Sequence, residues 1–168
     1  MSGRDELTER ILGTLARRHS TATVLFHHAV AERLGLGPTD HKCLDLVVEH
    51  QTVTGSELAA MTGLTSGAVT GVVNRLEQAG YIRREPDPED GRRQLLRPVP
   101  ERFGEAERLF KGIAVSAAGL LDGFDDQQLE AIATFLTRST EFARERAAVL
   151  RAEVLGRGGR TRKTQGEP

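Results

Sequence analysis

The sequence predicts a mainly α-helical chain with one small β-hairpin, and two observations from the middle of the chain carry this prediction. Between residues 54 and 80, apolar residues recur at helical spacing in two short runs that Gly63 separates. Two short strand-like runs then flank the turn sequence DPEDGRR. Longer helical patterns precede and follow this stretch, in residues 4–34 and 101–155.

The first short helix is predicted by its end signals. Thr54 and Glu57 have the spacing of a capping box, and Gly63 supplies the left-handed residue on which many helices end. Thr65 is placed to cap a second helix that stops at Gly80, and its inward-facing residues are Val69, Val72, Val73 and Leu76. Two helices joined by a tight glycine-containing turn form a helix-turn-helix.

The hairpin follows directly. Its expected strands are residues 81–84 and 94–99, and the intervening turn carries exposed arginines at its tip. Gly91 is expected to let the hairpin turn tightly, so that Arg92 projects outward. Helix-turn-helix and basic hairpin together describe a winged helix-turn-helix.

The outward face of the second helix is small and polar, with Ser66, Gly67, Thr70, Gly71, Asn74 and Arg75. A helix that enters a DNA major groove needs short hydrogen-bonding groups and little bulk. Each glycine inside a helix costs about 1 kcal/mol relative to alanine, which close approach to another surface would justify. The alternative is an ordinary solvent-exposed face.

The segments LTSGAVTGVVNRLEQAGYIRR and DPEDGR resemble the MarR family of bacterial transcription regulators, most specifically in N-R-L-E-x-x-G-x-I-x-R and D-x-x-D-G-R. The resemblance is strong over residues 39–99 and consistent in element order to about residue 153. Two positions depart from the family pattern: Gly71 stands where the family often has arginine, and RPVPE replaces L-T-x-x-G after the wing.

The resemblance implies a homodimeric transcription regulator that reads a pseudo-palindromic site on double-stranded DNA, and a repressor that a small-molecule effector releases. Residues 1–36 and 101–155 would form the dimerisation helices, and residues 37–100 the DNA-binding lobe. The apolar faces of the terminal helices are wider than is needed to cover the core of the lobe, which also favours an interface.

Site residues follow from helical spacing and from the wing. We expect Ser66, Gly67, Thr70 and Asn74 to face the bases and Arg75 to lie toward the DNA backbone. Arg92 is expected in the minor groove, and Arg93 on phosphate or on an acidic neighbour. Asp87 and Asp90 would be repelled by DNA and are expected to brace the wing through arginine pairs.

The flanking helices have marked ends. The first pattern stops at Gly35, with any bend expected near residues 19–23, where serine and threonine weaken helix propensity. Pro38 opens a helix to His50 with Leu44, Val47 and Val48 inward. Gly123 separates the last two helices, residues 101–122 and 125–155, and Asp125 caps the final one. The glycine-rich, polar residues 156–168 predict a disordered basic tail.

Composition excludes several classes of protein. One cysteine suits a reducing cytoplasm, the lack of any run of 18 apolar residues predicts no membrane span, and a net charge of −1 by itself excludes nothing. The family resemblance implies a cytoplasmic, nucleoid-associated bacterial protein. No nucleotide-binding loop, nucleophile motif or metal-ligand spacing appears, so we expect no enzyme activity, cofactor or metal. Histidines distant in sequence can still converge, so a metal role stays open, as does a redox-sensing role for Cys43 in place of a core role.

A second interpretation keeps the fold and drops the DNA. A winged-helix dimerisation or protein-interaction module would share these elements. It would give no reason for exposed cationic residues at the wing tip, where Arg92 and Arg93 stand.

Overall fold

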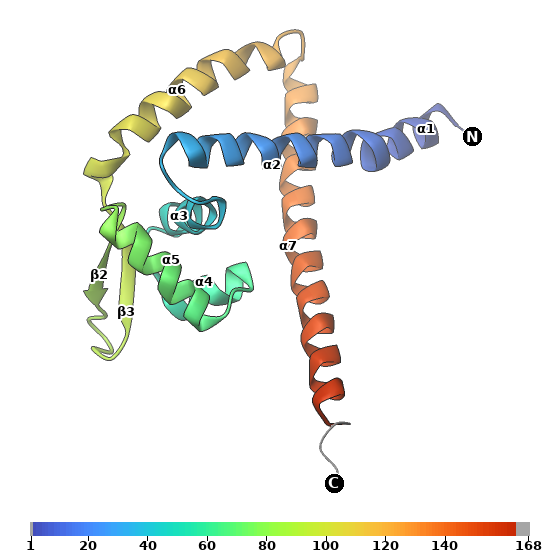
Figure 1. Cartoon of the computed structure of the whole chain (residues 1–168). Coiled ribbons are helices and arrows are strands. Elements are labelled where there is room, and N and C mark those ends of the chain that lie inside the picture. Colours follow the sequence, from blue (N-terminus) through green and yellow to red (C-terminus); the bar gives the residue numbers. More distant parts are fainter. Residues whose placement is uncertain (1, 164–168) are drawn as a thin grey trace. The chain divides into compact units, whose positions relative to one another are not determined.

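The computed structural model describes residues 2–163 and divides the chain into two compact units, Met1–Arg108 and Leu109–Pro168 (Figure 1). The first unit holds the N-terminal helix and the whole winged helix-turn-helix lobe. The second holds most of α6 and all of α7. Each unit is described by itself below.

The N-terminal helix is interrupted near its start. Helix α1 (Gly3–Glu9) passes into a π-helical stretch, Arg10–Leu15, and then into α2 (Ala16–Arg33). The helix is unbroken at residues 19–23, where any bend was expected, and its irregular stretch lies nearer the N-terminus. Gly13 lies inside it, and glycine holds an α-helix poorly. Helix α2 ends where Gly35 takes a φ of +69°, as the sequence predicted.

The winged helix-turn-helix lobe has the predicted order with one addition. It consists of α3 (Pro38–His50), β1 (Val53–Thr54), α4 (Gly55–Thr62), α5 (Ser66–Gln78), β2 (Ile82–Pro86) and β3 (Gln94–Pro98). Strand β1 pairs antiparallel with β3, which pairs with β2, so the hairpin belongs to a three-stranded sheet. A two-residue strand shows no alternation, which explains why the sequence did not predict β1.

The caps of α4 and α5 are those predicted. The Thr54 side chain accepts from the Glu57 N–H while Glu57 accepts from the Thr54 N–H, which completes the capping box. The Thr54 N–H first, and then the Thr54 hydroxyl, donate to the Glu57 carboxylate, and these two hydrogen bonds lower the pKa of Glu57. Gly63 and Gly80 both have positive φ. The Tyr81 N–H donates to the Leu76 carbonyl, so the chain folds back over the last turn of α5.

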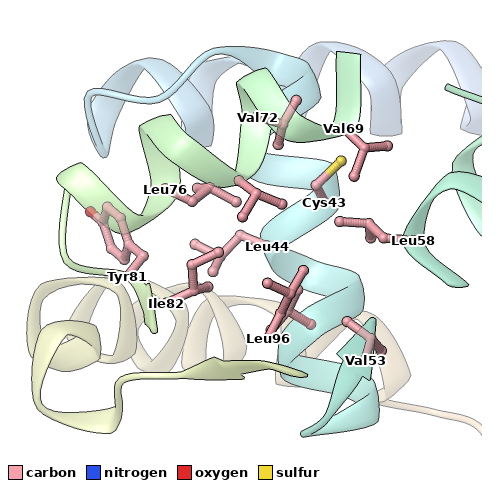
Figure 2. Packing of buried hydrophobic residues seen from close by; sticks show 12 residues of the cluster. Cys43, Leu44, Val53, Leu58, Val69, Val72, Leu76, Tyr81, Ile82 and Leu96 are labelled. Atoms are coloured by element: carbon pink, nitrogen blue, oxygen red, sulfur yellow. The ribbon is translucent and has the colours of Figure 1, made fainter. Parts of the chain in front are cut away.

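The core of the lobe lies between α3, α4, α5 and the sheet. Figure 2 shows Val69, Val72 and Leu76 of α5 directed toward Leu44 and Cys43 of α3. The cluster is closed by Val53, Leu58, Ile82 and Leu96, which come from four other elements. Val48, expected in the buried stripe of α3, is instead exposed, because the buried face of that helix runs through Cys43, Leu44 and Val47.

After the lobe, a 3₁₀ turn, Pro100–Phe103, leads into α6 (Gly104–Ala118), a second 3₁₀ turn (Gly119–Leu121) and α7 (Asp126–Lys163). Gly123 has a φ of +85°, and Asp125 and Gln128 exchange capping hydrogen bonds, as expected. The predicted tail, residues 156–168, falls partly on the helix as far as Lys163 and otherwise outside the described residues. Its disorder stays a prediction.

Apolar side chains line the surface of the second unit. Val115, Leu120, Phe142, Leu150 and Val154 are each more than three-fifths exposed. Monomeric proteins seldom leave such stripes in water. None of the described helices is long and apolar enough to cross a membrane.

The buried face of α5 gives a stability prediction. Leu76 is fully buried, so Leu76→Ala should lower the free energy of unfolding by about 2–5 kcal/mol. Gln78→Ala, an exposed change on the same helix, should stay within about 0.5 kcal/mol of wild type. Urea denaturation followed by circular dichroism measures both. Equal midpoints would contradict the packing described here.

Candidate nucleic-acid interface

The outward face of α5 is the first component of the site. Ser66, Gly67, Thr70 and Asn74 are exposed, while the valines and Leu76 of the same helix are buried. A Cβ added at Gly67 would meet no atom within 4 Å. The face is therefore shallow at its N-terminal end, which is the end that reads base edges in helix-turn-helix proteins.

Two of these side chains already have partners within the lobe. The Thr70 hydroxyl donates to the Ser66 carbonyl at 2.9 Å, which leaves its oxygen free to accept elsewhere. The Asn74 side-chain oxygen accepts from Arg84 of β2 at 2.5 Å, so its amide group remains as the donor toward a ligand. Arg84 also pairs with Glu77, and this ties α5 to the wing.

Arg75 has a second role that the sequence did not predict. Its guanidinium binds Asp40 of α3 through two parallel hydrogen bonds of 2.8 and 2.7 Å. The Asp40 side chain is only 9% exposed and that of Arg75 is 58% exposed, so a carboxylate at the lobe surface is covered by an arginine from α5. The hydrogen bonds to Asp40 raise the pKa of Arg75. The expected contact of Arg75 with the DNA backbone stays a prediction.

Gly71 lies beside this ion pair. A Cβ at this position would stand 3.4 Å from Nη1 of Arg75. This is ordinary van der Waals contact with the end of a flexible side chain, so the ion pair does not by itself require glycine at position 71.

The wing tip is built around two aspartates. Asp87 Oδ1 accepts from the Glu89 N–H and Asp90 Oδ1 from the Arg92 N–H, as in Asx turns. The same two carboxylates lie 3.7 Å from Arg93 and 3.2 Å from Arg92. Both aspartates were expected to pair with arginines. Arg93 lies beside Asp87, and an acidic neighbour was one of the two partners expected for it.

Gly91 differs from expectation. Its φ is not positive, and an added Cβ would meet nothing within 4 Å. The turn is closed instead by backbone bonds from Arg93 to the Asp90 carbonyl and from Asp87 to the Arg93 carbonyl. The glycine is therefore not required by the turn itself.

At the base of the wing, one carboxylate pairs with two arginines. Glu85 lies between Arg83 and Arg97, which are opposite each other across the β2–β3 pair, at 2.6 and 2.8 Å. The Arg83 hydrogen bond is the larger cause that lowers the pKa of Glu85. By contrast, the Arg92 side chain is 93% exposed. It is the most exposed of these arginines.

The helix face and the wing share one groove. It has a volume of about 600 Å³ and is lined by Ser66 and Thr70 of α5 and by Arg84, Arg92 and Arg93 of the wing. Short hydroxyls on one wall and guanidinium groups on the other are chemically suited to a polyanion with readable edges.

Cys43 is not part of this groove. It is fully buried, and burial, with a smaller contribution from Asp40, raises its pKa to about 11. A reactive redox cysteine is exposed and has a lowered pKa. These observations favour the core role over the redox-sensing role.

Comparison with known proteins agrees with this geometry. Residues 34–93 match the model of the MarR family. The HTH-type transcriptional regulator YcgE of Bacillus subtilis (strain 168) is 39% identical over 144 residues, which are 86% of this chain and 93% of that protein. The organic hydroperoxide resistance transcriptional regulator of the same strain is 30% identical over 99 residues, 59% of this chain and 64% of that protein.

Solved structures show the same fold. A MarR family protein from Bacillus stearothermophilus gives a TM-score of 0.66 at 19% identity and covers 82% of this chain and 96% of that one. The transcriptional regulator SlyA gives 0.57 at 18% identity, over 84% and 96% of the two chains.

The Asp40–Arg75 pair predicts non-additive stability. Arg75→Gln leaves Asp40 without its partner, and Asp40→Asn leaves Arg75 without its own, so each should lower the thermal midpoint without DNA. The double variant should lose less than the sum, because the second change removes a charge already unpaired. Circular dichroism melts of the four proteins measure this. Strict additivity would show that the pair carries no coupling.

Cys43 should resist modification. Because the thiol is buried, iodoacetamide should label the native protein at pH 7.5 far more slowly than the urea-unfolded protein. Mass spectrometry over time measures both rates, and the unfolded chain is the matched control. Rapid labelling of the native protein would restore the redox interpretation.

Proposed function

Because the chain belongs to the MarR family of transcriptional regulators, we propose that it is a transcription regulator that binds a pseudo-palindromic DNA site as a homodimer. In this proposal α5 enters the major groove and the wing reaches the adjacent minor groove. The main support for this proposal is the groove that the outward face of α5 shares with Arg92 and Arg93.

The reading residues are assigned from exposure and chemistry. Ser66 and Thr70 present hydroxyls at the N-terminal end of α5, and Asn74 presents an amide donor one turn further on. Gly67 between them admits a base edge without steric conflict. Hydroxyl and amide groups of this kind make the side-chain contacts that distinguish base pairs in the major groove.

Dimerisation is supported by the apolar surface of the terminal helices. Leu12 and Leu25 in the N-terminal helix are also more than three-fifths exposed, like the stripe on α6 and α7. A second copy that covers these residues would remove that surface from water. A dimer in turn places two α5 helices to read half-sites about 34 Å apart.

Repression rather than activation is proposed from the family resemblance. We expect a repressor, released by a small molecule that binds the DNA-incompetent dimer better than the DNA-bound one. A ligand without that difference in affinity would not release DNA.

The test of this function is a binding-site selection from random duplexes with the full chain. We expect an inverted repeat, and light scattering of the complex should give two chains per duplex. Thr70→Ala should lose about 1–3 kcal/mol of discrimination at one position in each half-site. Thr39→Ala, an exposed threonine on α3, is the matched control. A sequence-independent pool, or one chain per duplex, would refute the proposal.

The wing gives an asymmetric prediction. Arg92→Ala should weaken binding and lower the salt slope by about one unit, because one cation leaves the DNA surface. Asp90→Ala should also weaken binding, by loosening the wing turn, but with the salt slope nearly kept. Titrations by fluorescence anisotropy at several salt concentrations separate the two effects.

Arg92→Lys is the matched control, since it keeps the charge and removes the guanidinium. It should retain the salt slope, and any weaker preference for a narrow A·T-rich groove would measure what the guanidinium adds beyond its charge. If Arg92→Ala binds as wild type does at every salt concentration, the wing takes no part in binding.

A further inference from the structure

The first unit brings together three potential metal ligands that are not neighbours in the sequence. His27 of α2 and His41 and Asp45 of α3 each offer one ligand atom, and these atoms lie within 4.8 Å of one another. His41 and Asp45 are one helical turn apart, and the packing of α2 on α3 supplies His27. Spacing along the chain does not bring these three residues together, so the sequence did not predict this ligand set.

The two imidazoles are held close and incompletely satisfied. Their ring centroids are 5.7 Å apart, and His41 Nδ1 lies 3.4 Å from Asp45 Oδ2. Nδ1 of His27 and Nδ1 of His41 are both buried, and neither has a hydrogen-bond partner among the described residues. Buried polar atoms without partners are rare in native proteins, and an absent ion is one established explanation.

We propose that His27, His41 and Asp45 bind a divalent transition-metal ion of the zinc type, with solvent completing the coordination. Two imidazoles and one carboxylate are a three-ligand set suited to zinc, whereas magnesium and calcium take oxygen ligands. This ligand set lies outside the groove formed by α5 and the wing, whose lining residues are different.

The geometry needs only a small adjustment. Ligands of a tetrahedral zinc ion with bonds of 2.0–2.2 Å stand about 3.4 Å apart, so atoms up to 4.8 Å apart must close by up to about 1.4 Å. Rotation of the Asp45 side chain, which is 43% exposed, supplies part of that movement and opens a path to solvent. The buried His41 is the fixed member of the set.

The surroundings supply one competitor for the ion. Lys42 lies 3.1 Å from Asp45 Oδ2, so an ion must share or displace this exposed lysine.

Zinc titration of the untagged full chain by calorimetry tests the site. We expect one ion bound per chain, and a rise in thermal midpoint as bound zinc stabilises the fold. Asp45→Asn changes an exposed residue and should fold normally, yet weaken binding at least about tenfold by removing a ligand charge. His27→Phe keeps a ring in place and should weaken it further. His28→Phe, next to His27 but outside the ligand set, should bind as wild type does.

Cobalt substitution supplies a readout that a merely structural role would not change. The wild-type complex should show intense visible bands of a four-coordinate ion and no thiolate charge-transfer band, since Cys43 is not a ligand. Loss of the visible bands in Asp45→Asn and His27→Phe, with retention in His28→Phe, supports the site. Absence of stoichiometric binding at micromolar zinc, unchanged affinity in Asp45→Asn and His27→Phe, or a thiolate band overturns it.

Discussion

The lobe depends on the burial of one face of α5. Val69, Val72, Val73 and Leu76 must leave water, and α3, α4 and the sheet are the surfaces that receive them. Once this face is fixed, helical geometry leaves no choice about the opposite one. The small polar residues that we assign to DNA reading are therefore positioned by the core, and their own contacts contribute little to that placement.

The wing is organised by a different force. Its arginines are matched with acids at nearly every step, from Glu77 and Glu85 at the base to Asp87 and Asp90 at the tip. Exposed pairs of this kind add little stability individually. They do prevent repulsion among cations crowded onto two short strands. The result is a hairpin in which most charges are paired and Arg92 is the most exposed of its paired arginines.

The sequence predicted what local chemistry determines and missed what packing determines. The ends of α4 and α5 were predicted because the residues that mark them act within a few positions of the chain. These residues are Thr54, Glu57, Gly63 and Gly80. The pairing of Asp40 with Arg75 spans 35 positions, and the meeting of His27 with His41 requires two helices to pack. Neither contact produces a periodic pattern in the sequence. The π-helical stretch at Arg10–Leu15 likewise has no distinctive composition.

Arg84 gives the lobe a mechanical property. It binds Asn74 and Glu77 at once, so β2 and the C-terminal half of α5 are cross-linked by side chains as well as by the tight turn at Gly80. A small movement of α5 therefore carries the hairpin with it. In the proposed function both elements contact DNA, so a signal that weakens binding would act on the position of the whole lobe, because the spacing between α5 and the wing is set within the lobe.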